Sequence, residues 1–201
     1  MDELLQRRYK KVLDILPDVA ECTRGKLVLA GGTALALFHL EHRISIDLDF
    51  IPLHGKEERA KEALKGCLSR KGYRTTVGAY SNQFVVQFED TGIKIEIFSP
   101  KHKIKGYIEF DVGSSKMLVC SVDEILELKM ESYADRKEAK DLFDVIFILK
   151  ERAQGFGAVE KLLSETGPPV NMDYVRRIAL GEEDYQYFVK VVEDASKTGN
   201  K

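Results

Sequence analysis

The sequence lacks several patterns that define common classes of protein. No stretch of the 201 residues approaches the ~20 apolar residues of a membrane-spanning helix, and the first ten residues contain no apolar signal core. Lysine and arginine number 31 against 33 acidic residues, which excludes the strongly basic charge of a dedicated nucleic-acid-binding protein. We therefore expect a cytoplasmic protein with no membrane partner.

Cysteine is scarce as well. Cys22, Cys67 and Cys120 are an odd number, form no CxxC pair and have no histidine cluster nearby. This spacing indicates neither a disulfide framework nor a zinc site, so we expect reduced thiols. The GxGxxG pattern and the P-loop pattern are also absent, which leaves the chain without either of these phosphate-binding signatures.

The sequence does contain enough apolar residues, 44%, to bury a substantial core. Its N-terminal part mixes helical and strand periodicity, and the part after residue 120 is helical in pattern throughout. This predicts an α+β fold, with a mixed sheet and flanking helices in residues 1–116 and a helical lobe in residues 117–201. Pro17 is expected to end the first helix. The expected helices are 3–16, 33–39, 57–71, 122–133, one after Glu138, 157–164, 173–180 and 182–195; the expected strands are 26–30, 43–51, 73–77, 83–89, 93–98 and 107–112.

Two aspartates stand out in the apolar segment 43–51. Asp47 and Asp49 are two residues apart, and alternate residues of a strand point to the same face. Two carboxylates held together on an apolar strand repel each other unless a cation compensates them. A hard divalent ion such as Mg²⁺ binds carboxylates together with substrate phosphates. Pairing with Arg43 is the alternative explanation.

A glycine turn precedes these aspartates. The segment 26–30 reads as a strand, and Gly31 and Gly32 lead from it into a helix for which Thr33 is a candidate N-cap. Free backbone N–H groups at such a turn favour an anion, and glycine lets phosphate oxygens approach the backbone. The pattern therefore predicts a phosphate-binding turn, although a turn that only packs closely would read the same way.

A third carboxylate is available on another strand. Two metal ions that clamp a phosphoryl group require more ligands than one pair of aspartates. In the strand 93–98, Ile93, Ile95 and Ile97 share one face, and Lys94 and Glu96 share the other. Glu96 is therefore the candidate third metal ligand, and an acid on a solvated sheet face is the alternative.

The helical part has its own charged cluster. Lys129 and Arg136 are seven residues apart, and cations near a triphosphate neutralise the charge that grows as pyrophosphate departs. Asp141 and Asp144 share one side of a helix and would repel unless Lys140, Arg136 or a substrate group lies between them. A solvated charged face is the alternative reading.

These segments together resemble a known family. The runs GGTALAL (residues 31–37), HRISIDLDF (42–50), KMESYADR (129–136) and KDLFD (140–144) occur in the order typical of the AbiEii/AbiGii-type nucleotidyltransferases. That family belongs to the DNA polymerase beta-like nucleotidyltransferase superfamily. The resemblance covers residues ~27 to ~149.

The resemblance implies a nucleotidyltransferase fold whose helical lobe completes the active-site cleft. It implies that Gly31, Gly32 and Thr33 bind phosphate and that Asp47, Asp49 and Glu96 are catalytic and bind Mg²⁺, with Glu96 as general base. Lys129 would contact the nucleotide phosphates, and Asp144 would lie near the nucleotide or acceptor. The implied reaction moves an NMP unit from an NTP to RNA, a protein or a small molecule. Related proteins are toxins, so an antitoxin partner is expected, and we expect a monomer.

Two other functions fit some of these features. The same fold could serve as a non-catalytic module that binds a nucleotide or a partner protein. A phosphohydrolase of the haloacid dehalogenase kind also carries an Asp-x-Asp strand. Against that class, Ile51 stands where such enzymes have threonine or valine, and no later glycine-aspartate pair follows.

Overall fold

The computed structural model describes residues 3–152, 155–166, 170–183 and 185–198. The chain divides into two compact units, Met1–Glu124 and Ile125–Lys201, and each is described by itself. Within the described residues, no helix is long and apolar enough to cross a membrane.

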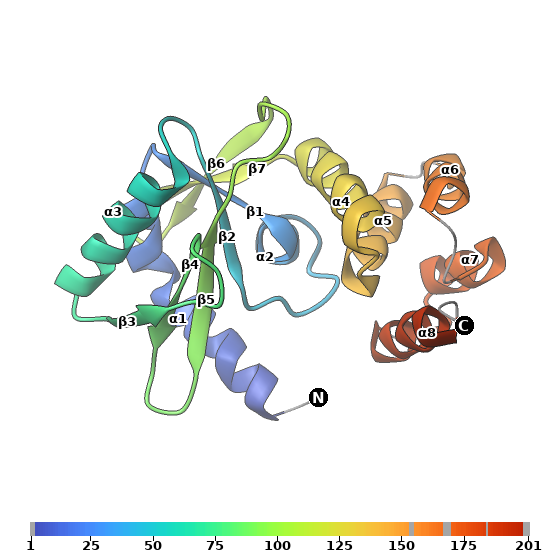
Figure 1. Cartoon of the computed structure of the whole chain (residues 1–201), viewed down its shortest axis with the longest axis horizontal. Helices are drawn as coiled ribbons and strands as arrows, with labels where there is room; N and C mark the ends of the chain where they lie inside the picture. Colours follow the sequence, from blue (N-terminus) through green and yellow to red (C-terminus); the bar gives the residue numbers. More distant parts are fainter. Residues whose placement is uncertain (1–2, 153–154, 167–169, 184, 199–201) are drawn as a thin grey trace. The chain divides into compact units, whose positions relative to one another are not determined.

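The strands of the N-terminal unit form one mixed sheet, as the sequence predicts (Figure 1). The described strands follow the order β3-β4-β5-β2-β1-β7-β6, in which β1 is antiparallel to β2 and parallel to β7, and β2 is parallel to β5. The sheet therefore places β1, β2 and β5 side by side at its centre. Their bounds are β1 Leu27–Ala30, β2 Leu48–Pro52, β3 Arg74–Val77, β4 Gln83–Gln87, β5 Gly92–Ile97, β6 Tyr107–Val112 and β7 Ser115–Cys120.

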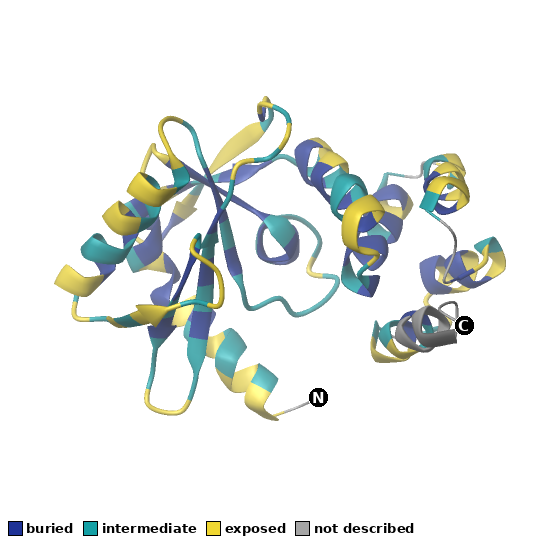
Figure 2. Ribbon diagram, viewed as in Figure 1, coloured by how far each residue is buried: buried dark blue, intermediate teal, exposed yellow. Residues whose placement is uncertain are grey.

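Helices lie on both sides of this sheet (Figure 1). Helices α1 (Glu3–Thr23) and α3 (Glu57–Arg70) pack against each other and against β5, so they cover one face. Helix α2 (Gly31–Leu35) and the π-helical turn η1 (Ala36–Leu40) lie on the other side, where α2 contacts β1 and β2. The central strands are buried between these layers (Figure 2).

The first helix is longer than expected. The prediction that Pro17 ends it is wrong, because α1 continues through Pro17 to Thr23. Its buried positions recur at helical spacing on both sides of the proline: Val12, Ile15, Leu16, Val19, Ala20 and Thr23. Burial of this continuous apolar stripe outweighs the roughly 3 kcal/mol that a proline costs inside a helix.

Two strands differ from the prediction. Strand β2 begins at Leu48, not at residue 43, and the segment before it is irregular. Strand β7 was not predicted at all, although it is a central partner of β1 and pairs with β6 along its whole length. The expected lobe boundary, between residues 116 and 117, falls inside this strand. The remaining predicted strands are present with ends that differ by one or two residues.

Two of the three cysteines form a disulfide, so the expectation of reduced thiols is wrong for Cys22 and Cys67. Cys22 lies near the end of α1 and Cys67 near the end of α3, and the packing of these helices brings their Cα atoms to 5.7 Å. A separation of 45 residues hides this pairing from local sequence patterns. Cys120 is free and buried, and burial raises the pKa of its thiol to about 12.

The C-terminal unit is helical, as predicted. Helix α4 (Val122–Arg136) leads into it, and α5 (Ala139–Glu151), α6 (Gly157–Thr166), α7 (Met172–Leu180) and α8 (Tyr185–Thr198) follow. Helix α7 is capped by Asn171, whose side chain accepts a hydrogen bond from the Tyr174 backbone N–H. The helices share one apolar core, to which α5 contributes most of its length.

Candidate active site

The glycine turn touches the aspartate strand directly. Gly31 follows β1 with a φ of +71°, a conformation that favours glycine. A Cβ atom on Gly31 would collide with the carboxylate of Asp49, and one on Gly32 would collide with the guanidinium of Arg43. The two glycines therefore let a carboxylate and a guanidinium approach the backbone of the turn, and a larger residue at either position would displace one of these side chains.

Thr33 has a different local role from the one expected. The helix begins at Gly31 with Ala30 as its N-cap, so the prediction that Thr33 caps it is wrong. The Thr33 hydroxyl is buried, donates a hydrogen bond to the backbone carbonyl of Asp47, and lies 2.9 Å from Ser45 Oγ. Thr33 thus ties the irregular segment before β2 to α2, which positions Asp47 next to the turn.

Glu96 lies beside the aspartates. Strand β5 pairs with β2 in a register that sets Glu96 opposite Asp49. Glu96 Oε2 accepts a hydrogen bond of 2.7 Å from Gln83, and Oε1 accepts one of 3.2 Å from Asn82. Both donors belong to the start of β4 or the residue before it, so the β4–β5 pairing holds the carboxylate in one orientation.

A lysine lies among the three carboxylates. Lys94 Nζ is 3.1 Å from Asp47 and 3.7 Å from Glu96. Burial alone would lower the pKa of Lys94, but nearby negative charge outweighs this effect and raises the pKa above its ordinary value. That charge comes from Asp47, Asp49 and Glu96. The three carboxylates therefore act together on a single cationic position.

A second cation approaches from the first helix. Arg8 of α1 lies 3.9 Å from the carboxylate of Asp47. Asp47 therefore has two cations beside it, Lys94 and Arg8. Arg43 itself donates to the carbonyl of Ile44 at 3.2 Å. Asp47, Lys94 and Glu96 remain about one-third to one-quarter exposed, so solvent and ions reach this cluster.

The predicted residues of the C-terminal unit form a separate, buried network. Lys129 Nζ is 2.8 Å from both Asp141 and Asp144. Arg136 contacts the other oxygen of Asp141 at 3.0 Å. The two aspartates are fully buried and Lys129 is 7% exposed. Lys129 and Arg136 therefore separate the acidic pair, whereas Lys140 pairs with Glu138 at 2.9 Å.

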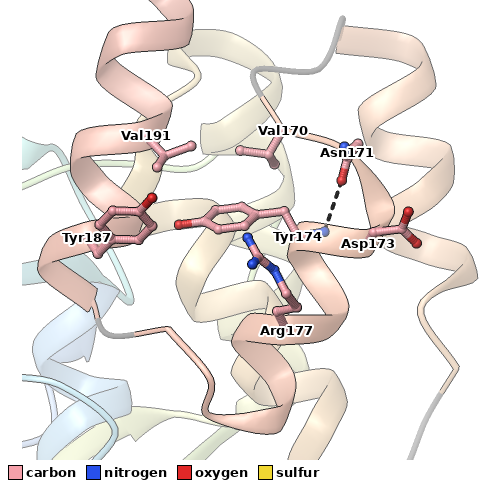
Figure 3. A pocket seen from close by; sticks show the side chains of 7 residues that line it. All are labelled: Val170, Asn171, Asp173, Tyr174, Arg177, Tyr187 and Val191. Carbon is pink, nitrogen blue, oxygen red and sulfur yellow. Dashed lines mark hydrogen bonds between the residues drawn. The ribbon is translucent and has the colours of Figure 1, made fainter.

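The C-terminal unit also contains a pocket of about 400 Å³ between α7 and α8 (Figure 3). The Arg177 guanidinium lies 5.2 Å from the ring centre of Tyr174 and pairs with Glu183 at 3.1 Å. The Tyr187 ring meets the Tyr174 ring edge to face. These contacts stay within the helical unit, and we assign the pocket no catalytic role.

Sequence reasoning missed several residues of the acidic cluster. Asn82 and Gln83 orient Glu96, and Arg8 approaches Asp47. Gln83 faces Glu96 directly across the β4–β5 hairpin, so cross-strand pairing offered a signal for it. Arg8 carried no local signal, because the contact depends on how α1 packs.

The fold and the site define a class. Two solved structures show the fold: JHP933 from Helicobacter pylori (18% identity, TM-score 0.52, 100% of this chain and 98% of that chain) and an antigenic nucleotidyltransferase-like protein from Paracoccidioides brasiliensis (14%, 0.53, 93% of each). The chain is an α+β protein with the fold of these two structures.

The family model described as "Nucleotidyl transferase AbiEii toxin, Type IV TA system" matches residues 15–173. The chain therefore belongs to the AbiEii family and is a nucleotidyltransferase, an enzyme that transfers a nucleoside monophosphate unit. A search of curated proteins gives no match.

Proposed function

We propose that this chain is an Mg²⁺-dependent nucleotidyltransferase that moves an NMP unit from an NTP to an acceptor and releases pyrophosphate. The observation that carries the proposal is the convergence of Asp47, Asp49 and Glu96 on one cationic position beside the Gly31 turn. A divalent ion is suited to this group, because it takes carboxylate oxygens as ligands and would offset the repulsion between the three acids.

The cluster fits Mg²⁺ by its chemistry. Its donors are all carboxylate oxygens, which Mg²⁺ prefers, and the cluster is open enough for water and phosphate oxygens to complete the coordination. The Lys94 ammonium is the cation next to Asp47 in this structure. Metal binding at Asp47 would therefore require this ammonium to move away. When bound, divalent metal would lower the pKa of the attacking hydroxyl and neutralise the leaving pyrophosphate.

The residues of the chain would then position the reactants. The acceptor oxygen forms a bond to the α-phosphorus, the bond from that phosphorus to the bridging oxygen of the β-phosphate breaks, and pyrophosphate leaves. We assign the acceptor proton to Glu96, which keeps free lone pairs although Asn82 and Gln83 each donate to it. Gly31 and Gly32 would accept the triphosphate against the backbone, while Thr33 holds Asp47 in place.

The roles of Lys129 and Asp144 belong to the same proposal. Resemblance assigns Lys129 to the nucleotide phosphates and Asp144 to the nucleotide or acceptor. In the present arrangement the two side chains bind each other at 2.8 Å and are buried. Nucleotide contact would therefore require Lys129 to leave this pair, and their first role is to hold α4 against α5.

The description of the family supports a proposal for the biological setting. AbiEii proteins are described as toxins of type IV toxin–antitoxin systems. We propose that this chain is such a toxin, acts as a monomer in the cytoplasm on RNA, a protein or a small molecule, and has a cognate antitoxin.

The proposal is tested by incubating the protein with each labelled NTP, Mg²⁺ and a cell extract, and following both label transfer and pyrophosphate. We expect transfer from at least one NTP that stops when EDTA removes the metal. Transfer that persists in Asp47→Asn and Asp49→Asn variants would contradict the assigned site. Nucleotide binding without pyrophosphate release under any acceptor condition would contradict catalysis.

A further inference from the structure

The N-terminal unit contains a basic pocket that the proposed nucleotidyl transfer does not use. It has a volume of about 560 Å³ and lies where the end of α1, the start of β1 and the length of α3 meet. Leu27, which lines it, pairs with Pro52 at one end of β1, whereas Ala30 pairs with Asp49 at the other end. At ~3.3 Å per strand residue, roughly 10 Å of β1 separates the pocket from the acidic cluster.

The pocket is lined by an excess of positive charge. Four cationic side chains line it: Lys26, Lys56, Arg59 and Arg70. Among the described residues, none of these four side chains has an ion pair or hydrogen bond, and all four are exposed. His54 adds a further potential donor to the lining.

The two carboxylates of the lining pair with lysines that do not line the pocket, and one of these lysines, Lys71, also pairs with Asp18 at 3.0 Å. Glu21 pairs with Lys71 at 2.6 Å. Glu62 pairs with Lys61 at 3.6 Å and with Lys65 at 4.0 Å. The four free cations therefore give the pocket a positive potential, although the whole chain has a net charge of −2.

The walls of this pocket are held together covalently. Cys22 and Cys67 both line it, and their disulfide joins α1 to α3. Figure 1 shows the two helices on the same side of the sheet. The disulfide and the neighbouring Ala60 and Ala63 give the lining an apolar part next to the cations. A fixed concave site of a few hundred Å³ suits a small ligand better than a flat macromolecular contact.

We propose that this pocket is a second anion-binding site, which takes a small molecule bearing two or more phosphate groups. Arginine and lysine are the usual partners of phosphate oxygens, and several cations around one concave site favour a ligand with several charges. The ligand is either an inorganic polyphosphate or a nucleoside polyphosphate whose apolar part contacts Ala60, Ala63 and the disulfide. The proposal does not depend on catalysis at the acidic cluster.

The test is titration calorimetry of the full chain in EDTA at low salt, with inorganic tripolyphosphate and with ATP as separate probes. EDTA removes divalent ions, so the metal-free carboxylates of the acidic cluster repel both probes. We expect binding of at least one probe, weakened about tenfold or more in the double variant Arg59→Glu/Arg70→Glu. Tighter binding of ATP than of tripolyphosphate would identify a nucleoside polyphosphate, and the reverse an inorganic one.

The matched control reverses two cations elsewhere in the same unit. Lys10 and Lys103 are exposed and have no ion pair within the described residues. Lys10→Glu/Lys103→Glu changes the net charge equally and is expected to bind as the unaltered protein does. Lys26→Ala/Lys56→Ala provides a milder pocket variant, and circular dichroism confirms that each variant is folded. Absence of binding by both probes, equal weakening in the control, or binding of single-stranded RNA alone would overturn the proposal.

Discussion

The two charged clusters of this enzyme differ in how far they are exposed and in how their charges are paired. In the N-terminal unit, Lys94 contacts Asp47 and Glu96, Asp49 lies opposite Glu96, and the cluster is partly exposed. In the C-terminal unit, two aspartates face two cations, and the aspartates are fully buried. The acidic cluster of the N-terminal unit is open to a further cation from solvent. In the C-terminal unit, the buried aspartates are already paired with Lys129 and Arg136.

The comparison indicates that exposure to solvent, more than residue type, distinguishes the proposed metal site from a structural network. Both clusters contain paired acids near a lysine. In a buried network of paired charges, each charged group has lost its contact with water and depends on its partner. Removing one partner therefore strongly destabilises the fold. In a partly exposed cluster of carboxylates, the acids repel one another and destabilise the fold. Such a cluster suits ligand binding, because a cation can reach it from solvent.

The largest expected effect is the loss of activity when a carboxylate of the acidic cluster is removed. Asp49→Asn removes one carboxylate charge next to the Gly31 turn and is expected to reduce kcat/KM for nucleotidyl transfer about 10³-fold or more. Asp111→Asn, at an exposed position of β6, is the matched control and should retain activity. Pyrophosphate release measures both, and equal activity of the two variants would refute the assignment.

The second prediction concerns the buried network. Asp141→Asn removes the buried carboxylate charge that Lys129 and the half-exposed Arg136 share, and is expected to lower the free energy of unfolding by about 3 to 5 kcal/mol. Urea unfolding measures this loss. Asp173→Asn, whose side chain is 90% exposed, should change stability little. A change in the KM for NTP without loss of stability would instead support nucleotide contact by this cluster.

The third prediction separates the two units. All three cysteines precede residue 125, and the Cys22–Cys67 disulfide closes a separation of 45 residues within the N-terminal unit. Its reduction is expected to destabilise that unit by about 2 to 4 kcal/mol. Hydrogen exchange with and without reductant should show faster exchange in α1 and α3, while α5 serves as the internal reference. The Cys22→Ala/Cys67→Ala variant should not respond to reductant, and a response there would point to another cause.

The smallest expected effect is that of a neutral buried group. Tyr133 is fully buried, and its hydroxyl has no hydrogen-bond partner among the described residues. Tyr133→Phe is therefore expected to leave stability at pH 7 unchanged or to raise it by about 1 kcal/mol, because an unsatisfied hydroxyl is removed. A loss of more than that in urea unfolding would show that the hydroxyl has a partner.

The same variant has a defined pH dependence. Burial raises the pKa of Tyr133 from 10.0 to about 12, so the unfolded chain loses this proton first. The stability linked to Tyr133 is fully present below pH 10 and declines as the pH rises from there to about 12. Tyr133→Phe should lose less stability over that range, measured by urea unfolding in steps of pH. Cys120, whose pKa is also raised to about 12, contributes equally in both proteins.

Local patterns predicted much of the fold and the grouping of the acidic cluster. The alternation in residues 93–97 put Lys94 and Glu96 on one face, and the structure places both beside the predicted aspartates. The α+β class and the helical C-terminal part are confirmed. These features depend on periodicities of a few residues, which a single sequence carries.

The features that were missed depend on distant partners. β7 is a short apolar run whose role comes from pairing with β1, about ninety residues earlier in the chain. The disulfide requires α1 and α3 to share a sheet face, and Lys129 reaches Asp141 and Asp144 only because α4 and α5 pack together. No local pattern specifies such contacts.

The most direct test of the central claim is a crystal structure of the chain with Mn²⁺ and a non-hydrolysable NTP, in which anomalous scattering locates the metal. Our account predicts a metal peak bound by Asp47, Asp49 and Glu96, with Lys94 farther from Asp47 than its present 3.1 Å. A triphosphate bound elsewhere, with no metal among these carboxylates and Lys94 still in contact with Asp47, would contradict it.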